Sequence, residues 1–266
     1  MLRRDPRRVL QVPIIPLEII DDCWKEPETF MDRLRARCYI SSNRYRRVLI
    51  EFLCTAIFVY GGLSSGAQRA ISNFSSHDWL GMCIGWGISL ALSIQLASNI
   101  SGGHLNPAIS LHFLSMGRLC IYDFLLYTVA QICGAYVGSA LMYVTYYDGL
   151  HALMDTKMDD IVMMKLFAPY PAPNTTIIGG LLDQIMGTAY FSICLSSITD
   201  VRNGVPSFLQ PTFIGLNLML IGIFAGYHFG FAINPARDLG SRLFALSIGF
   251  GRRTFLFVQF YLFHLK

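Results

Sequence analysis

Two short polar motifs interrupt apolar sequence in separate parts of this chain. They are Asn106-Pro107-Ala108 and Asn234-Pro235-Ala236. Asparagine is a favoured N-cap and proline suits the first helical position, so each motif predicts the start of a helix. The asparagine oxygen would cap its own helix, which leaves the amide NH₂ to donate hydrogen bonds. The chemistry indicated is recognition of a lone pair on a neutral solute, without bond making or breaking.

The segments that follow the two motifs predict a pair of half-helices. "NPAISLHFLSMG" and "NPARDLGSRLFALSIG" are apolar enough to enter a membrane and too short to cross it. Non-helical backbone at membrane depth must be buried in protein or line a water-filled cavity. We therefore expect the half-helices to enter from opposite faces and to meet at their N-termini near the midplane. Their combined positive potential would admit neutral solutes and oppose protons and metal cations.

The elements that must position these motifs are membrane-spanning helices. The 266 residues are 53% hydrophobic and 14% charged, with a mean hydropathy of +0.46, whereas soluble domains carry about 25% charge. A span needs roughly 20 apolar residues. We expect five full spans, in the runs 48–66, 79–98, 124–147, 177–199 and 212–231. The stretch 254–266 would rise only about 20 Å as a helix and predicts a short or incomplete sixth span.

The spans and motifs fall into two related halves. "EFLCTAIF" at 51–58 matches "QIMGTAYF" at 184–191, and each half reads as span, span, motif segment, span. Three spans per half is an odd number, so the second half must enter with opposite orientation, which gives an inverted repeat. We expect an all-α membrane protein. Its predicted parts are an N-terminal segment 1–47 and a channel domain 48–266, divided into a first repeat 48–147, an outer loop 148–176 and a second repeat 177–266.

Charges and sequons suggest a topology. Arginines before the first span favour a cytoplasmic N-terminus, with binding to anionic lipid as a second interpretation. They are Arg33, Arg35, Arg37, Arg44, Arg46 and Arg47. Residues 1–47 contain no apolar signal-peptide core. The possible glycosylation sites Asn73 and Asn174 then lie in outer loops. The seven cysteines lie elsewhere, so we expect no disulfide, and no metal-site spacing occurs.

Together these features resemble the major intrinsic protein family, the aquaporins, over roughly residues 45–244. The likeness rests on "SGGHLNPA" at 101–108, "GFAINPARD" at 230–238 and the pair Glu51 and Gln184. The "NPARD" sequence and the long third loop ending "FAPYPAPNTT" are similar to the glycerol-conducting branch. The resemblance implies a multi-pass protein of the plasma membrane, without cofactor, assembled as a homotetramer or as a hetero-oligomer with related subunits.

The resemblance also implies a selectivity filter. The matching residues are Trp86, Gly222, Phe231 and Arg237. Two aromatic rings would form an apolar corner for a carbon backbone, the glycine would keep the aperture wide, and the arginine would donate to hydroxyl oxygens and repel cations. Water-selective members carry a histidine near the glycine position. That histidine is absent here, and His228 is not treated as a substitute.

Further residues are assigned supporting roles. A carboxylate inside a span is costly unless it is paired, and the resemblance suggests that Glu51 and Gln184 hold the two motif loops through backbone hydrogen bonds. Asp238 is expected to neutralise or orient donors beside Arg237. His104 is expected to line the cytoplasmic vestibule. Gly134 and Gly138 form a GxxxG face suited to close helix packing.

These interpretations favour a passive channel for glycerol, other small neutral solutes such as urea, and water. No nucleophile–base pair, phosphate loop or cofactor motif stands out, so an enzyme is not expected, and neither is a nucleic-acid partner. Two alternatives remain open. The terminal "RRTFLFVQFYLFHLK" contains no Gly or Ala, which suggests a non-conducting, truncated isoform that assembles with full-length subunits. A secondary transporter also has inverted repeats, and Glu51 would then be part of an ion site.

Overall fold

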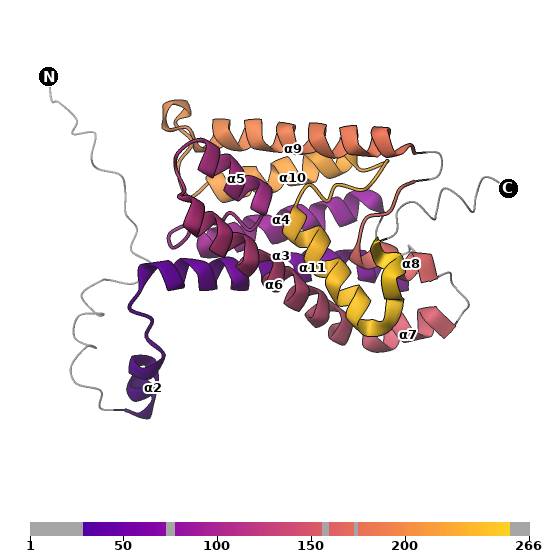
Figure 1. Cartoon of the computed structure of the whole chain (residues 1–266), viewed down its shortest axis with the longest axis horizontal. Helices are drawn as coiled ribbons and strands as arrows, with labels where there is room; N and C mark the ends of the chain where they lie inside the picture. The colour runs from indigo at the N-terminus through magenta and orange to yellow at the C-terminus, as the bar shows by residue number, and fades with distance from the viewer. Residues whose placement is uncertain (1–28, 73–77, 156–159, 173–174, 256–266) are drawn as a thin grey trace, which may run out of the picture. The chain divides into compact units, whose positions relative to one another are not determined.

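The structure is a computed structural model that describes residues 29–72, 78–155, 160–172 and 175–255 (Figure 1). The chain divides into two compact units, one up to Ser42 and one from Asn43 onward. In the first unit, helix α2 (Phe30–Cys38) begins with a capping box in which the Thr29 hydroxyl accepts a hydrogen bond from the Asp32 amide. The other helices of the described residues belong to the second unit, where the spans and both motifs lie.

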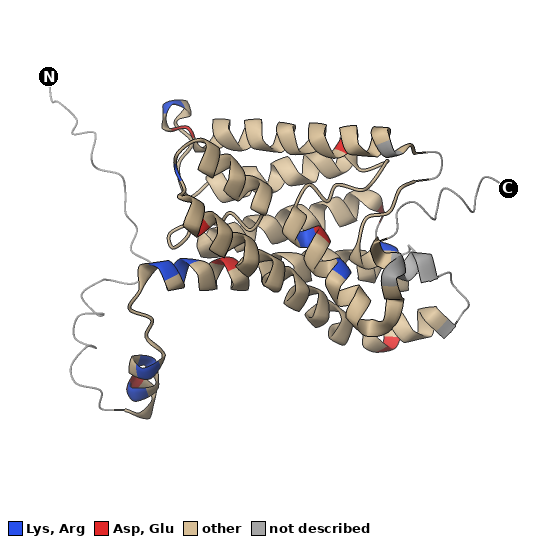
Figure 2. Cartoon of the chain, viewed as in Figure 1, with Lys and Arg blue, Asp and Glu red and all other residues tan. Residues whose placement is uncertain are grey.

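Four helices in the described residues are long and apolar enough to cross a membrane. They are α3 (Asn43–Ile71), α4 (Trp79–Ala97), α6 (Ile121–Thr145) and α9 (Ile177–Thr199). Charged residues are sparse along these four helices except in the first turns of α3, and others lie in α2, in α11 and in the connections (Figure 2). The first span begins at Asn43, before the apolar run that starts at Val48.

The prediction of five full-length spans is corrected to four by the shortness of the next helix. Helix α10 (Gln210–Ala225) has 16 residues and ends before Phe231, where the apolar run stops. The helix ends because the chain turns back toward the second motif. In that turn the His228 carbonyl accepts a hydrogen bond from the Ala172 amide, and the Gly230 carbonyl accepts one from Gln184. Apolar composition alone could not locate this end.

Glycines allow the long helices to pack backbone against backbone. A Cβ added at Gly134 of α6 would lie 2.3 Å from the Phe52 carbonyl oxygen of α3, and one at Gly138 would lie 2.4 Å from that of Ala56. No larger residue fits at these distances, so the expected GxxxG face lies at the α3–α6 contact. The helix pair α4 and α10 packs in the same manner where Gly87 meets Gly215.

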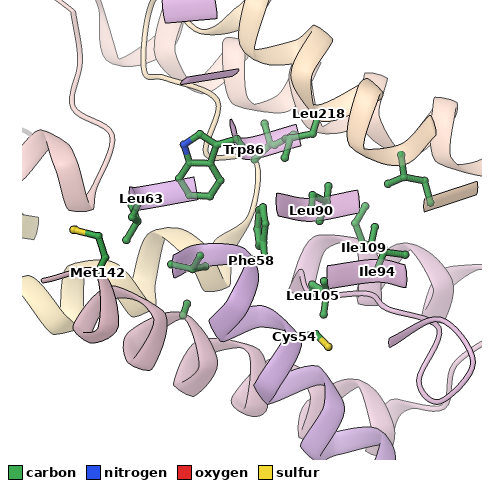
Figure 3. Packing of buried hydrophobic residues seen from close by; sticks show 14 of the residues in the cluster. Cys54, Phe58, Leu63, Trp86, Leu90, Ile94, Leu105, Ile109, Met142 and Leu218 are labelled. Atoms are coloured by element: carbon green, nitrogen blue, oxygen red, sulfur yellow. The ribbon is translucent and has the colours of Figure 1, made fainter. Parts of the chain in front are cut away.

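The interior of the second unit is an apolar cluster shared between helices. Phe58 of α3 makes an edge-to-face contact with Trp86 of α4, with ring centroids 5.3 Å apart. Leu90 and Ile94 follow Trp86 along the same face of α4 (Figure 3). Leu218 of α10 lies in the same cluster. The inward face of α4 is thereby fixed, and this face also borders the cavity described below.

Two short helices begin at the motifs. They are α5 (Pro107–Ser115) and α11 (Pro235–Ala245). Helix α11 packs on α6, while α5 contacts both α6 and α9. The segment between α6 and α9, expected as a loop, contains helices α7 (Tyr147–Asp155) and α8 (Asp160–Phe167).

After α11 the chain continues as a π-turn (Leu246–Phe250) and a 3₁₀ turn (Gly251–Phe255). Residues 256–266 lie outside the described part of the chain. The expected short sixth span, and the truncated isoform inferred from it, therefore stay predictions. The two sequon residues, Asn73 and Asn174, also lie outside the described residues.

Candidate functional site

The two motifs meet at their asparagines, although they come from opposite halves of the chain. The Asn106 Nδ2 atom donates to the carbonyl oxygen of Ile233 at 3.0 Å, and the Asn234 Nδ2 atom donates to that of Leu105 at 2.8 Å. The expectation that both NH₂ groups are left free is therefore corrected, because each uses one N–H to tie the halves together. An amide carries two N–H donors, so one per asparagine remains available for a solute.

Each asparagine also caps its own helix, as its oxygen was expected to do. The Asn106 Oδ1 atom accepts from the Ala108 amide at 2.8 Å. The Asn234 Oδ1 atom accepts from the amides of Ala236 and Arg237 at 3.0 and 3.2 Å. A proline occupies the first turn of each helix, where it removes an N–H that would have no helical partner. The positive ends of α5 and α11 are thus brought to one place.

The residue before each asparagine has an unusual backbone. Leu105 has φ of +51° and Ile233 has φ of +29°, in the left-handed region that side chains with a Cβ rarely adopt. Such residues cost about 1–3 kcal/mol each and persist where their surroundings hold them. Their carbonyl oxygens are the two acceptors of the cross-motif bonds. The strain and the bonds that stabilise it are therefore features of the same contact.

The Glu51 side chain holds the first motif loop in place through hydrogen bonds. Its side chain is fully buried. The carboxylate accepts four hydrogen bonds, from Ser101 Oγ (2.6 Å), the His104 amide (2.9 Å), the Leu105 amide (2.8 Å) and Gln131 Nε2 (2.8 Å). These donors compensate a carboxylate at membrane depth without a cation.

Gln184 holds the second loop with fewer bonds. Its Oε1 atom accepts from the Ile233 amide at 3.1 Å, and its Nε2 atom donates to the Gly230 carbonyl at 3.1 Å. The Nε2 atom also lies 3.3 Å from Asp183 Oδ2. The two repeats therefore use one side chain each at matching places, a charged acceptor in the first and a neutral donor–acceptor in the second.

A cavity of about 690 Å³ runs along α4 and past both asparagines. Most of the lining residues of α4 recur every three or four positions, which is one helical face. They are Trp79, Met82, Trp86, Leu90 and Ile94, together with Gln95 and the C-cap Ser98. Nineteen residues of helix rise about 28 Å at 1.5 Å each, close to the hydrocarbon thickness of about 30 Å. Asn106 and Asn234 line the cavity between its ends.

The charges that line this cavity are positive. They are Arg69, Lys165 and Arg237, and none of the described lining residues is an Asp or Glu. Glu51 does not line the cavity, and its carboxylate is occupied by protein donors. Among the described residues the path offers no acidic site for a cation, which argues against Glu51 as a transporter's ion site.

The four expected filter residues are linked by a chain of contacts. The rings of Trp86 and Phe231 are 6.4 Å apart at 82°, and the Arg237 Cζ atom lies 4.8 Å from the Trp86 ring centroid. A Cβ at Gly222 would lie 2.9 Å from Phe231 Cζ. Gly222 is not among the lining residues, so its missing side chain makes room for the Phe231 ring. The expectation that Gly222 keeps the aperture wide stays a prediction.

Asp238 pairs with a donor one turn further along α11. Its carboxylate accepts from Arg242 Nε at 2.9 and 3.0 Å. The reason is helical spacing, because residues four apart share a face whereas adjacent residues do not. Arg242 is 2% exposed and also donates to the carbonyls of Pro169 and Thr254. The pair thus joins α11 to two neighbouring segments.

His104 lies in the wall of the cavity. Its ring stacks on Phe113 with centroids 4.6 Å apart, and its Nδ1 atom is 3.1 Å from Ser110 Oγ. The ring is therefore held by the start and the end of α5, with one of its nitrogens occupied by a hydroxyl.

Comparison with known proteins agrees with this geometry. The sequence profile of the major intrinsic protein family matches residues 39–265. The chain belongs to the major intrinsic protein family. It is 35% identical to aquaporin-9 of Mus musculus over 236 residues, covering 87% of this chain and 80% of that protein. It is 34% identical to aquaglyceroporin-2 of Rhizophagus irregularis over 228 residues, covering 84% and 72%.

A solved structure is similar as well. The aquaglyceroporin from Plasmodium falciparum superposes with a TM-score of 0.73 at 28% identity, covering 83% of this chain and 88% of that one. These relatives place this major intrinsic protein in the aquaglyceroporin branch and confirm the resemblance drawn from the two motifs. They also establish an all-helical, multi-pass membrane protein of a channel family, and not an enzyme.

Three residues of this major intrinsic protein site were missed from sequence. Arg242 stands four residues after Asp238 and could have been paired with it by helical spacing. Gln131 is a buried amide in an otherwise apolar span, and an isolated polar residue in a span is itself a signal. Trp79 lines the cavity and donates from Nε1 to the Gly222 carbonyl at 2.9 Å. The signal that could have found Trp79 is its spacing of seven residues from Trp86, which places both on one face of a helix.

Proposed function

We propose that this chain is a passive channel that conducts glycerol, other small neutral solutes and water across a membrane. The observation that carries the proposal is the cavity along the full length of α4, bordered by both asparagines and by Trp86, Phe231 and Arg237. Such a path needs no conformational cycle to expose a site alternately to the two sides. Urea is a further candidate permeant, because it is small, neutral and rich in hydrogen-bonding groups.

The walls suit a solute that has both carbon and hydroxyl faces. Trp86 and Phe231 offer apolar ring surface to the carbon chain. The guanidinium of Arg237 and the free N–H of each asparagine amide offer donors to hydroxyl oxygens. A polyol that passes these groups exchanges hydrogen bonds with water for hydrogen bonds with the protein, so its desolvation is compensated.

The same geometry opposes cations and protons. The helix N-termini of α5 and α11 meet at the asparagines, and the charged lining residues in the described chain are basic. A cation would lose hydration without gaining an acidic partner, and it would meet the positive ends of two helix dipoles. A neutral solute carries no such penalty.

The placement in the membrane is part of the same proposal. The proposed inverted repeat pairs α3 with α9, α4 with α10 and α5 with α11. Helices α5 and α11 then enter from opposite faces of the membrane. The matched roles of Glu51 and Gln184 and the matched strain at Leu105 and Ile233 support this symmetry. We propose a cytoplasmic N-terminus, the plasma membrane as the site, and a homotetramer or an assembly with related subunits.

Uptake by oocytes expressing this chain tests the function. Radiolabelled glycerol uptake and osmotic swelling would be measured at a surface level confirmed by biotinylation, with water-injected oocytes as the baseline. We expect both to exceed the baseline and to be linear in solute concentration, because a channel has no saturable transport cycle. Baseline uptake at confirmed surface level would refute the proposal, and flux that depends on an ion gradient would favour a transporter.

A further inference from the structure

Trp79 occupies the first turn of α4, at one end of the cavity. The Asp78 side chain caps this helix by accepting from the Gly81 amide at 3.0 Å. Trp79 is seven residues before Trp86, so both indoles lie on one face of the helix, two turns apart. Both line the cavity. The family resemblance assigned Trp86 to the filter and gave Trp79 no role.

The ring of Phe231 is inserted between these two indoles. It makes an edge-to-face contact with Trp79 at 6.0 Å and 81°, and another with Trp86 at 6.4 Å and 82°. Gly222 lies against the same ring, since a Cβ there would be 2.9 Å from Phe231 Cζ. The Phe231 ring is therefore confined by three neighbours, and removing Trp79 would leave the side toward that end of the cavity open.

Trp79 also fixes the end of the helix that provides one of those neighbours. Its Nε1 atom donates to the Gly222 carbonyl at 2.9 Å, in the last turn of α10. Its ring lies against Gly226, where a Cβ would be 2.3 Å from Trp79 Cζ2. One side chain thus contacts the helix end that carries Gly222 and the loop that carries Phe231.

We infer that Trp79 is a positioning residue for the channel's size selectivity, acting through the Phe231 ring. This inference rests on the proposed function, because it concerns which solutes pass the constriction. The width available to a polyol beside Trp86 and Arg237 depends on where the Phe231 ring lies. With Trp79 in place the ring cannot swing toward that end of the cavity, so longer or bulkier polyols are held back relative to glycerol.

The test compares solute ratios, which do not depend on how much protein reaches the membrane. Purified wild type and variants would be reconstituted, and the permeabilities to water, glycerol and the four-carbon polyol erythritol measured by stopped-flow light scattering. Trp79→Leu removes the ring, and Trp79→Phe keeps a ring that can contact Phe231 without the N–H. Tyr190→Leu is the matched control. It removes a ring whose centroid lies 5.2 Å from that of Phe224 in an edge-to-face contact, and neither of these two residues lines the cavity.

We expect Trp79→Leu to raise the erythritol-to-glycerol ratio about two- to tenfold, the range for loss of one aromatic contact. Trp79→Phe should stay within about twofold of wild type, and Tyr190→Leu should leave the ratio unchanged. In a Phe231→Leu background Trp79→Leu should have no further effect, because the two residues act as one unit. An unchanged ratio in Trp79→Leu, or an undiminished effect in the Phe231→Leu background, would overturn the inference.

Failure of the proposed function looks different in the same experiment. Wild-type vesicles would then match empty vesicles for glycerol. If they still pass water, the ratio of erythritol to water reports on Trp79 in the same way, and its increase in Trp79→Leu alone supports the positioning role.

Discussion

Replacing Glu51 by Gln should destabilise this protein far more than the change of a single atom suggests. The carboxylate is fully buried and receives four hydrogen bonds, two on each oxygen. In the amide, one oxygen becomes an NH₂ group that cannot accept. The backbone amide bound to that oxygen, of His104 or of Leu105 in the strained loop before Asn106, therefore loses its acceptor and faces another donor. The side-chain partner, the Ser101 hydroxyl or the Gln131 amide, can turn to present an oxygen to the new NH₂.

The magnitude follows from the lost backbone bond. A hydrogen bond to a charged group contributes about 1.5–3 kcal/mol, so Glu51→Gln should cost about 1.5–3 kcal/mol of the roughly 5–15 kcal/mol that stabilises a folded protein. At about 2–4 °C per kcal/mol for a chain of this size, the midpoint of thermal unfolding should fall by roughly 3 °C or more. The loop also positions Asn106, so glycerol flux per folded molecule should fall as well.

The assay is thermal unfolding of the detergent-solubilised protein, followed by tryptophan fluorescence, together with glycerol flux. Asp200→Asn is the matched control. Hydrogen bonds from Arg202 lower the pKa of Asp200 to about 2, so it is ionised at pH 7, yet the pair lies in an exposed turn and should contribute little. Gln184→Leu, which removes two neutral bonds, should cost about 1–3 kcal/mol. A midpoint for Glu51→Gln within about 2 °C of wild type would refute the reasoning.

Other substitutions test separate parts of the structure. Arg237→Ala should raise proton leak into reconstituted vesicles roughly tenfold or more, because a nearby unit positive charge contributes over about 1.4 kcal/mol to the barrier that a proton meets. The leak would be read with a pH-sensitive dye, and an unchanged leak would contradict the filter assignment. Asp238→Asn leaves buried Arg242 without its carboxylate and should cost about 3 kcal/mol in thermal unfolding, and an unaltered midpoint would show the pair to be unimportant. Gly134→Val should abolish surface expression, because its Cβ would lie 2.3 Å from a backbone oxygen of α3, whereas Gly66→Ala, with 3.9 Å to its nearest neighbour, should express normally.

Sequence patterns predicted the elements of this site because those patterns have direct physical causes. Asparagine before proline favours a helix start, so the first residues of both short helices could be placed where the structure has them, whereas their ends could not. The long apolar runs located four spans, because a helix that crosses a membrane needs roughly 20 apolar residues. The pairing of Glu51 with Gln184 followed from the repeat, and the structure gives both side chains backbone partners in the motif loops.

What the sequence could not predict depends on tertiary contacts. The end of α10 is set by hydrogen bonds of the following turn to Ala172 and Gln184, which apolar composition does not encode. The cross-motif bonds of the asparagine amides exist only once the two halves meet. Asp238 was placed among local donors without a named partner, and its partner Arg242 is set by the shared helix face.

Glycerol efflux from vesicles that contain only this chain tests the central claim most directly. The claim is that solute passes along α4 and between the two asparagine-capped helices. Ala232 lines that path, so Ala232→Trp should block it without touching either asparagine. The account predicts efflux well above empty vesicles for wild type, with no accompanying ion current, and efflux at the empty-vesicle level for Ala232→Trp. Wild-type efflux no faster than from empty vesicles, or undiminished efflux through the blocked variant, would contradict it.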